Sequence, residues 1–197
     1  GEGPAAVLLH GLFGASNNLG SVARALRDGY RVCSLDLPNH GRSKWIQGMD
    51  LSRLSNAVAQ WMTDNNVPRA HFLGHSLGGK VAMELALQAP ERVSALIVAD
   101  IAPVLYPAHH NAVFSALDAV AVARCESRQE AQVLMEGYLS EPGVIQFLLM
   151  SLQRGSDGRY DWRLNLEGIK RDYFAVRAAP TSGQSYLGPT LFIKGGD

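Results

Sequence analysis

The sequence predicts an α/β fold in which a parallel β-sheet is covered by helices on both faces. Short apolar runs alternate with amphipathic helical runs through the first hundred residues, and short loops join them. The rhythm then breaks, because residues 101–188 are helical in pattern and a strand-like run returns only at 189–195. We therefore expect a core made of residues 1–100 and 189–197, with residues 101–188 inserted as a helical cap over one edge of the sheet.

Each strand-like run is short and apolar and is bounded by turn residues, as is typical of strands buried in a parallel sheet. The runs are AAVLL (5–9), YRVCSLDL (30–37), AHFLG (70–74), VSALIVAD (93–100) and PTLFIKG (189–195). Each helical run places apolar residues three and four positions apart, so that they share one face. These runs are NLGSVARALRD (18–28), LSRLSNAVAQWMTDN (51–65) and the stretch between Ser76 and Pro90, followed in the insertion by NAVFSALDAVAVA (111–123), RQEAQVLMEGYL (128–139) and GVIQFLLMSLQR (143–154).

The composition fits one globular domain with a sizeable core. The chain has 197 residues, of which 47% are hydrophobic and 18% charged, and its formal net charge is zero. A balanced charge gives no electrostatic reason to expect nucleic acid or an anionic membrane as a partner. No apolar run approaches the ~18 residues of a membrane-spanning helix.

Cysteine usage and the first residues bear on where the protein works. Cys33 and Cys125 are isolated and form no C-x-x-C motif, so we expect two buried thiols in a reducing compartment. The opening GEGPAAVLLHGLFG enters a strand at once, without the basic stretch of a secretory signal, and it lacks an initiator Met. We expect an intracellular location, either the cytoplasm or an organelle such as the mitochondrion if a presequence has been removed.

Ser76 is enclosed by glycines at the junction between the third strand-like run and its helix. The sequence there is GHSLGG, which contains the G-x-S-x-G pattern of a nucleophile elbow. In that turn the positions two before and two after the serine nearly touch, so a Cβ atom at either would clash. The positive end of the following helix favours negative charge near the serine. The pattern predicts a nucleophile at Ser76 rather than a phosphate loop, because no Ser or Thr follows Lys80.

A serine nucleophile also needs N–H donors for the oxyanion that forms when it attacks a carbonyl. The loop HGLFG (10–14) follows the first strand-like run and is bracketed by glycines. Its Leu12 can direct a backbone N–H into the space above Ser76, and Leu77, just after the serine, is placed to supply the second donor.

Five stretches carry a family resemblance: HGLFG, LDLPNHGRS, GHSLGGKVAMELAL, VADIAPV and SYLGPTLFIKGGD, in this order. Over nearly the whole chain the sequence resembles the α/β-hydrolase fold, and within it the small serine esterases of the YbfF and ABHD11 type. The resemblance implies a carboxylic-ester or thioester hydrolase with a helical cap, a small-molecule acyl substrate, and neither a metal nor another cofactor. It also implies Ser76 as nucleophile, with Leu12 and Leu77 forming the oxyanion hole.

Two carboxylates compete for the acid of a catalytic triad. Asp197 ends LFIKGGD, the usual acid position of the fold, whereas Asp100 ends LIVAD, on the strand after the elbow helix. In the resembled subfamily the aspartate of DIAP is the acid, and relatives with GGN in place of GGD also favour Asp100. We predict Asp100 and keep Asp197 as the alternative. Asp36, at the end of the second strand-like run, is expected to have a structural role only.

The catalytic base is missing from the sequence. All six histidines lie at or before residue 110, whereas these hydrolases place the base after the acid. We expect the side chain of His75 to point away from the base position, and His109 and His110 to begin a solvated helix. The fold also expects a further strand and helix after residue 197. The chain is therefore predicted to be a fragment, incomplete at its C-terminus and cut before its catalytic histidine.

Further predictions concern the substrate pocket and the reaction. Apolar residues of the insertion, namely Phe147, Leu148, Met150 and Tyr173, would line an acyl pocket or else form the insertion's own core. The same elbow also serves C–C bond hydrolysis and perhydrolysis, and a non-catalytic binding module on this fold is a third reading.

Overall fold

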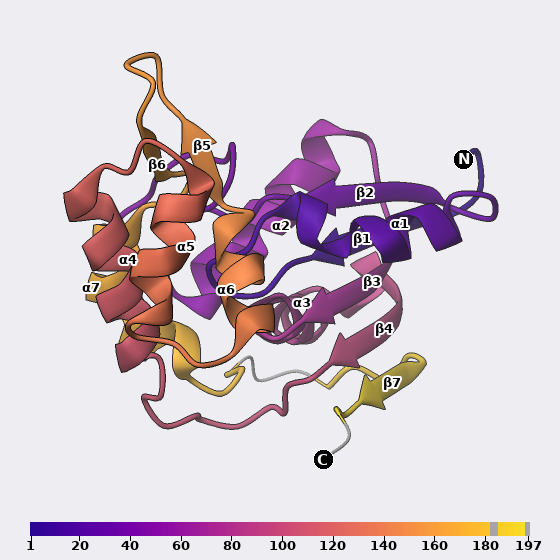
Figure 1. The fold of residues 1–197 in the computed structure, drawn as a ribbon. Helices are drawn as coiled ribbons and strands as arrows, with labels where there is room; N and C mark the ends of the chain where they lie inside the picture. Colours follow the sequence, from indigo (N-terminus) through magenta and orange to yellow (C-terminus); the bar gives the residue numbers. More distant parts are fainter. Residues whose placement is uncertain (182–184, 196–197) are drawn as a thin grey trace.

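A parallel sheet forms the centre of the computed structural model, which describes residues 1–181 and 185–195 (Figure 1). Within these residues the strand order is β2-β1-β3-β4-β7, and every neighbouring pair is parallel. The strands are β1 (Ala5–Leu9), β2 (Arg31–Leu35), β3 (Ala70–His75), β4 (Val93–Ala99) and β7 (Thr190–Ile193). The predicted α/β class is confirmed.

Helices lie on both faces of the sheet, as the alternation of elements predicted. The short 3₁₀ helix η1 (Ser16–Leu19) leads into α1 (Gly20–Leu26), which lies in front of the sheet in Figure 1. Behind it lie α2 (Leu51–Asp64) and α3 (Leu77–Gln88). The turn η2 (Pro90–Arg92) follows α3. Because β1 is paired on one side with β2 and on the other with β3, the chain reverses its direction of winding there. The carboxyl ends of β1 and β3 therefore flank a crevice suited to a ligand.

The core packs α3 against the middle of the sheet. All five residues of β1 are buried, and so are the residues of α3 from Leu77 to Ala86. A helix buried all round must satisfy its polar side chains internally. This makes α3 the central support of the molecule.

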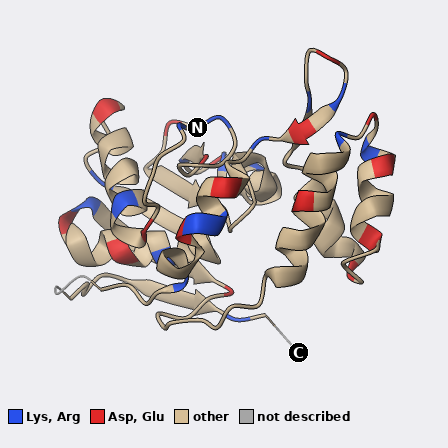
Figure 2. Cartoon of the chain, turned by 90° about the vertical axis from the view of Figure 1, so that its left-hand side faces the viewer, with Lys and Arg blue, Asp and Glu red and all other residues tan. Residues whose placement is uncertain are grey.

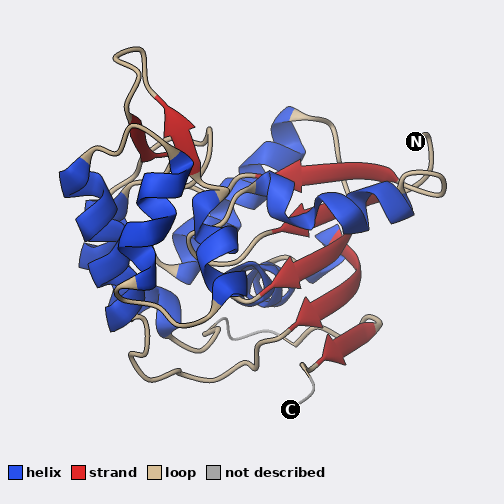
Figure 3. Cartoon of the chain, viewed as in Figure 1, coloured by secondary structure: helices blue, strands red, loops and turns tan. Residues whose placement is uncertain are grey.

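The helices and the hairpin between Asn111 and Arg177, within the predicted insertion (residues 101–188), lie beyond the carboxyl ends of the strands, toward which the strand arrows in Figure 3 point. It contains α4 (Asn111–Ala123), α5 (Arg128–Glu136), α6 (Pro142–Leu149), a hairpin of β5 (Leu152–Arg154) and β6 (Tyr160–Trp162), and α7 (Leu166–Arg177). It has buried side chains of its own, and the indole of Trp162 donates to the carbonyl of Leu117 at 2.9 Å.

The hairpin is a feature that the sequence reasoning missed. The run 143–154 was expected to be one helix, but α6 ends at Leu149 and the chain extends from Leu152 to pair with β6. Gly158, with φ +81°, lies in the turn between the two strands, a conformation that glycine adopts without strain. The hairpin depends on a pairing partner further along the chain, which helical periodicity does not report.

Charges of both signs are interspersed over the elements in Figure 2, in keeping with the zero formal net charge. Among the residues described, no helix has the length and apolar character needed to cross a membrane.

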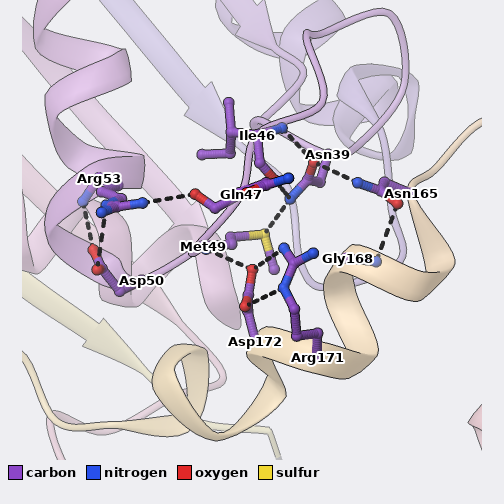
Figure 4. A network of polar contacts seen from close by, with 10 residues as sticks. All are labelled: Asn39, Ile46, Gln47, Met49, Asp50, Arg53, Asn165, Gly168, Arg171 and Asp172. Carbon is purple, nitrogen blue, oxygen red and sulfur yellow. Dashed lines mark hydrogen bonds and ion pairs between the residues drawn. The ribbon is translucent and has the colours of Figure 1, made fainter.

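A network of amide and carboxylate contacts joins the insertion to the loop after β2 (Figure 4). Asn39 is fully buried at φ +66°, and its side chain bonds both the N–H and the carbonyl of Ile46. Its amide oxygen also accepts from Asn165, and its backbone carbonyl accepts from the Asn165 N–H at 2.9 Å. Near the middle of α7, Asp172 accepts the Met49 N–H at 2.7 Å. The first half of α7 is thus fixed to the sheet's own loops.

Asn39→Ala is expected to lower the free energy of unfolding by roughly 2–4 kcal/mol, because it leaves buried donors and acceptors unpaired and strains the backbone. Urea denaturation measures this loss. Asn66→Ala is a matched control, since Asn66 also has a positive φ of 54° but is exposed. A similar loss in both variants would mean that backbone strain, rather than the network, accounts for the effect.

Candidate active site

A cavity of about 720 Å³ opens at the carboxyl edge of the sheet, below the insertion. It brings together four residues that the sequence singled out: Leu12, Ser76, Leu77 and Asp100. Its other lining residues are His75, Lys80, Ile101, Ala102, Tyr106, His109, His110, Tyr173, Val176, Arg177, Phe192, Ile193 and Lys194. The alternative acid, Asp197, lies outside the described residues.

Ser76 occupies a strained turn between β3 and α3, with φ 51° and ψ −118°. The turn is this tight because glycines permit it: a Cβ at Gly74 would lie 2.3 Å from the carbonyl oxygen of Gly78. A Cβ at Gly78 would in turn lie 2.2 Å from the carbonyl oxygen of Leu9. The Ser76 N–H still donates to the Ala99 carbonyl at 3.0 Å, while its own carbonyl accepts the first bonds of α3. A serine is therefore held at the point where strand turns into helix.

The loop after β1 lies directly beside this serine. A Cβ at Gly11 would come within 3.3 Å of the Ser76 Cβ. The backbone just before Leu12 therefore lies close to the nucleophile. On the other side, Leu77 is the first residue of α3, whose leading N–H groups have no partner inside the helix. Both predicted oxyanion donors thus belong to backbone that borders the serine.

Hydrogen bonds hold both the backbone N–H and the backbone carbonyl of Phe13. Its N–H donates to His40 Nε2 at 3.2 Å, and its carbonyl accepts from the hydroxyl of Ser151 at 2.7 Å. Ser151 is buried and belongs to the insertion, so the insertion helps to shape the loop that carries Leu12. Phe13 itself has φ 65°, a left-handed conformation that needs such support. Sequence reasoning missed Ser151, since nothing local marks it.

Two buried histidines fix the same loop as neutral rings. His10 accepts the Leu37 N–H through Nε2 at 3.0 Å, and its Nδ1 lies 2.8 Å from the Gly11 carbonyl and donates to it. Burial lowers the pKa of His10 to about 4. Burial, and then the neighbouring His10 ring, lower the pKa of His40 to about 3. Each ring therefore keeps one donor and one acceptor at neutral pH.

Asp36 ends the second strand-like run and bonds loop N–H groups, as expected of a structural carboxylate. It accepts from the backbone N–H of Ser16 at 2.6 Å and of Arg42 at 3.0 Å. Burial acts to raise its pKa, but the bonds from Arg42 and Ser16 outweigh it, and the pKa is lowered. Asp36 thereby ties the loop after β2 to η1.

Asp100 lies at the end of β4 with φ 58°, and its N–H donates to the Ile193 carbonyl at 2.8 Å. A Cβ at Gly195 would lie 3.3 Å from its Oδ1, so the carboxylate is placed next to the end of β7. It is exposed and borders the cavity. This position is close to both strand ends from which a triad acid can act.

Three histidines, His75, His109 and His110, border the cavity. His109 is exposed and His110 caps the start of α4, as expected of a helix start, but His110 is only partly exposed and is not simply solvated. His110 Nδ1 instead lies 2.5 Å from the hydroxyl of Tyr173, and its ring packs edge-on against Phe13. Burial, followed by the charges of His109 and Arg177, lowers the pKa of His110 to about 4.

The apolar residues proposed for an acyl pocket divide between the two roles considered. Tyr173 borders the cavity, whereas Leu148 is buried within the insertion's own packing. Met150 is 41% exposed and accepts a contact from the Asn18 amide. Phe147 packs on the core near Gly14. Of these four, Tyr173 is the one placed to touch a ligand.

Comparison with known proteins supplies a family. The family model described as alpha/beta hydrolase fold matches residues 4–127. Esterase YbfF of Escherichia coli (strain K12) is 35% identical over 192 residues, covering 97% of this chain and 73% of that protein. The sn-1-specific diacylglycerol lipase ABHD11 of Mus musculus is 38% identical over 202 residues, covering 98% and 66%. A solved structure of a marine microorganism esterase matches with a TM-score of 0.93 at 30% identity, covering 98% and 77%. The chain thus spans between 66% and 77% of the length of these relatives.

Acid is expected to destabilise the fold through His10 and His40. Their folded pKa values of about 4 and about 3 lie below the ordinary histidine value of 6.5, so the unfolded chain binds protons first. Their stabilising effect is complete above pH ~6.5 and is lost as the pH falls through those two values, with a slope of about 1.4 kcal/mol per pH unit for each. Urea denaturation between pH 4 and 7 measures the slope.

The variants His10→Gln and His40→Gln should each reduce that slope by about 1.4 kcal/mol per pH unit, the contribution of one proton. An unchanged slope in both variants would show that other groups account for the loss of stability in acid.

Proposed function

Since the chain belongs to the α/β-hydrolase family, we propose that it carries the nucleophile of a serine hydrolase that cleaves carboxylic esters or thioesters. The observation that carries the proposal is the backbone of Ser76, a left-handed turn at the mouth of a cavity bordered by Leu12 and Leu77. A strained nucleophile beside two backbone N–H donors, one from a loop and one from a helix start, is the arrangement that acyl transfer needs. A purely structural turn has no use for that strain.

The reaction follows from these positions. A base takes the proton from the Ser76 hydroxyl as Oγ attacks the carbonyl carbon of the substrate. The negative charge that develops on the carbonyl oxygen is held by the N–H groups of Leu12 and Leu77. The alcohol or thiol leaves with a proton from the base, and water then releases the acyl group from Ser76 by the same steps.

Asp100 is the proposed acid that orients the base and stabilises its charged form. Its carboxylate lies beside Gly195, at the end of β7, and borders the cavity that contains Ser76. Asp197, two residues beyond Gly195, remains the alternative. The strand ends of β4 and β7 are adjacent, so a carboxylate on either reaches the same imidazole.

The base is proposed to be a histidine beyond residue 197, in the part of the relatives that this chain does not span. Of the histidines near Ser76, His110 has Nδ1 engaged with Tyr173 and a pKa lowered to about 4. A ring with such a low pKa is a poor proton acceptor at neutral pH. His109 and His110 become candidates only if the isolated chain proves fully active.

The substrate is proposed to be a small acyl ester or thioester. The cavity of about 720 Å³ is lined by Leu, Ile, Val, Phe and Tyr side chains as well as polar groups, which suits an acyl chain. Two relatives carry the names esterase and sn-1-specific diacylglycerol lipase, which describe enzymes that act on esters. The insertion would act as a cap, since it supplies Tyr173 and Val176 to the cavity wall.

Ser76→Ala is expected to abolish hydrolysis of short acyl p-nitrophenyl esters, by a factor of about 10⁶, because no other group can form the acyl-enzyme. The assay uses the protein extended past residue 197, and circular dichroism checks that the variant is folded. The 197-residue chain alone should retain only the residual ~10³ to 10⁴ over water that the oxyanion donors and binding provide.

Full activity in the alanine variant would end the serine-nucleophile proposal. Equal activity in the short chain would instead place the base at His109 or His110. If esters are inert but C–C cleavage or perhydrolysis depends on Ser76, the same turn serves a different reaction.

Comparison of Asp100→Asn with Asp197→Asn identifies the acid. The true acid fixes the tautomer of the imidazole, so its amide variant should lose about 10⁴ in kcat with little change in stability. The other variant should lose less than about a hundredfold. We expect the large loss at Asp100; a large loss confined to Asp197 would reverse the assignment.

A further inference from the structure

Two charged residues are buried in α3 although the proposed acyl transfer uses neither of them. Lys80 and Glu84 lie one helical turn apart, and each is 2% exposed. Lysine and glutamate are rarely buried to this extent unless their polar atoms are satisfied. Their partners therefore identify what the two side chains are for.

Lys80 binds both connections between the insertion and the sheet. Its ammonium donates to the carbonyls of Val104 at 2.8 Å, Arg177 at 2.5 Å and Ala178 at 2.7 Å. Val104 precedes α4 and Ala178 follows α7, so a single group joins the entry and exit segments of the insertion. An ammonium has three N–H donors, and these carbonyls use all three. Lys80 therefore has no donor left for a substrate, although it borders the cavity.

The two connecting segments are also bonded to each other around this lysine. The Tyr106 N–H donates to the Arg177 carbonyl at 3.1 Å, and the Arg177 guanidinium donates to the Tyr106 carbonyl at 2.5 Å. The Tyr106 ring lies 4.9 Å from the lysine Nζ, within the range of a cation–π contact. The ammonium thus completes a compact joint made of both segments.

Glu84 extends the same joint along the exit segment. One of its carboxylate oxygens accepts the Thr181 N–H at 2.9 Å, and the other accepts from Gln88 at 3.0 Å. Residues at i and i+4 lie on one face of a helix, so Lys80 and Glu84 present opposite charges to one strip of backbone. That strip runs from Arg177 to Thr181.

We propose that Lys80 and Glu84 are positioning residues, a hinge lock that fixes the segments before α4 and after α7 to the helix carrying Ser76. Lys80 is in the first turn of α3, where its N–H donates to the Ser76 carbonyl at 3.2 Å. The lock therefore sets the distance between the nucleophile and the cavity wall that Tyr173 and Val176 supply. Its consequence for turnover rests on the proposed function, whereas the anchoring itself does not.

Burial, and then the positive charge of Arg177, lower the pKa of Lys80 to about 8. The side chain therefore keeps its proton, and with it all three N–H donors, in most molecules at pH 7.

Amide hydrogen exchange on the 197-residue chain at pH 7 tests the anchoring without any need for catalysis. Lys80→Met keeps the length of the side chain and removes its donors. It should raise exchange in residues 101–110 and 178–181 at least about tenfold while β1 and β3 stay protected. Lys170→Met is the matched control, because Lys170 lies on α7 but pairs with Asp118 and Glu167 at the surface of the insertion. Its connecting segments should exchange as in the parent chain.

A second pair of variants keeps the test decisive if Lys80→Met does not fold. Glu84→Gln retains an oxygen that can accept the Thr181 N–H, whereas Glu84→Met has none. Exchange around Thr181 should rise about tenfold in the methionine variant and stay within about twofold of the parent in the glutamine variant. Unchanged exchange of the connecting segments in folded Lys80→Met and Glu84→Met would overturn the proposal. An equal rise in β1 and β3 would also overturn it, because that shows a general loss of stability.

The kinetic test uses the protein extended past residue 197. If the lock positions the insertion, Lys80→Met should raise KM for a long-chain acyl ester about tenfold and leave kcat for an acetyl ester within about twofold. Equal losses of kcat on both esters would contradict a role in positioning the cavity wall. If the parent protein hydrolyses no ester, the proposed function fails, and the exchange results still decide whether the lock exists.

Discussion

The close approach of α3 to the sheet is the constraint on which the rest of this structure depends. Gly74 and Gly78 allow the helix to begin where any side chain would collide with the backbone of β1 or of α3 itself. The cost is a left-handed backbone at Ser76, which the surrounding hydrogen bonds sustain. Once α3 is fixed there, it is buried from Leu77 to Ala86 and can carry charged groups that act on other segments.

Two sets of polar contacts hold the insertion, one along the first half of α7 and one at its end. Just before α7, Asn165 bonds Asn39, and in the middle of α7 Asp172 bonds the N–H of Met49. Asn39 and Met49 both belong to the loop after β2. At the last turn of α7, the ammonium of Lys80 donates to the carbonyls of Arg177 and Ala178. The cavity borders the second of these attachments, and its walls come from elements far apart in the chain. Polar networks that are fully satisfied give such a site a defined shape.

The insertion also contacts the loop that carries Leu12, through the hydroxyl of Ser151 and the carbonyl of Phe13. His40 accepts the N–H of the same residue, so the loop after β2 and the insertion each bond one of the two peptide groups that flank Phe13, next to Leu12. The Phe13 ring packs edge-on against Phe114 of α4 at 5.3 Å. A displacement of the insertion would therefore disturb both the cavity wall and the loop that carries a proposed oxyanion donor.

The sequence by itself determined the α/β class, the turn at Ser76 and the presence of Leu12, Leu77 and Asp100 around the same cavity as Ser76. These follow from short-range rules, namely the period of apolar residues, the spacing of glycines and the meeting of strand ends at one edge. The tertiary structure alone decided that His110 borders the cavity, that residues 152–162 form a hairpin, and that Lys80 bonds carbonyls up to 98 positions away. The reason is physical: a buried polar group is satisfied by whatever backbone packs against it, and sequence periodicity does not record that partner.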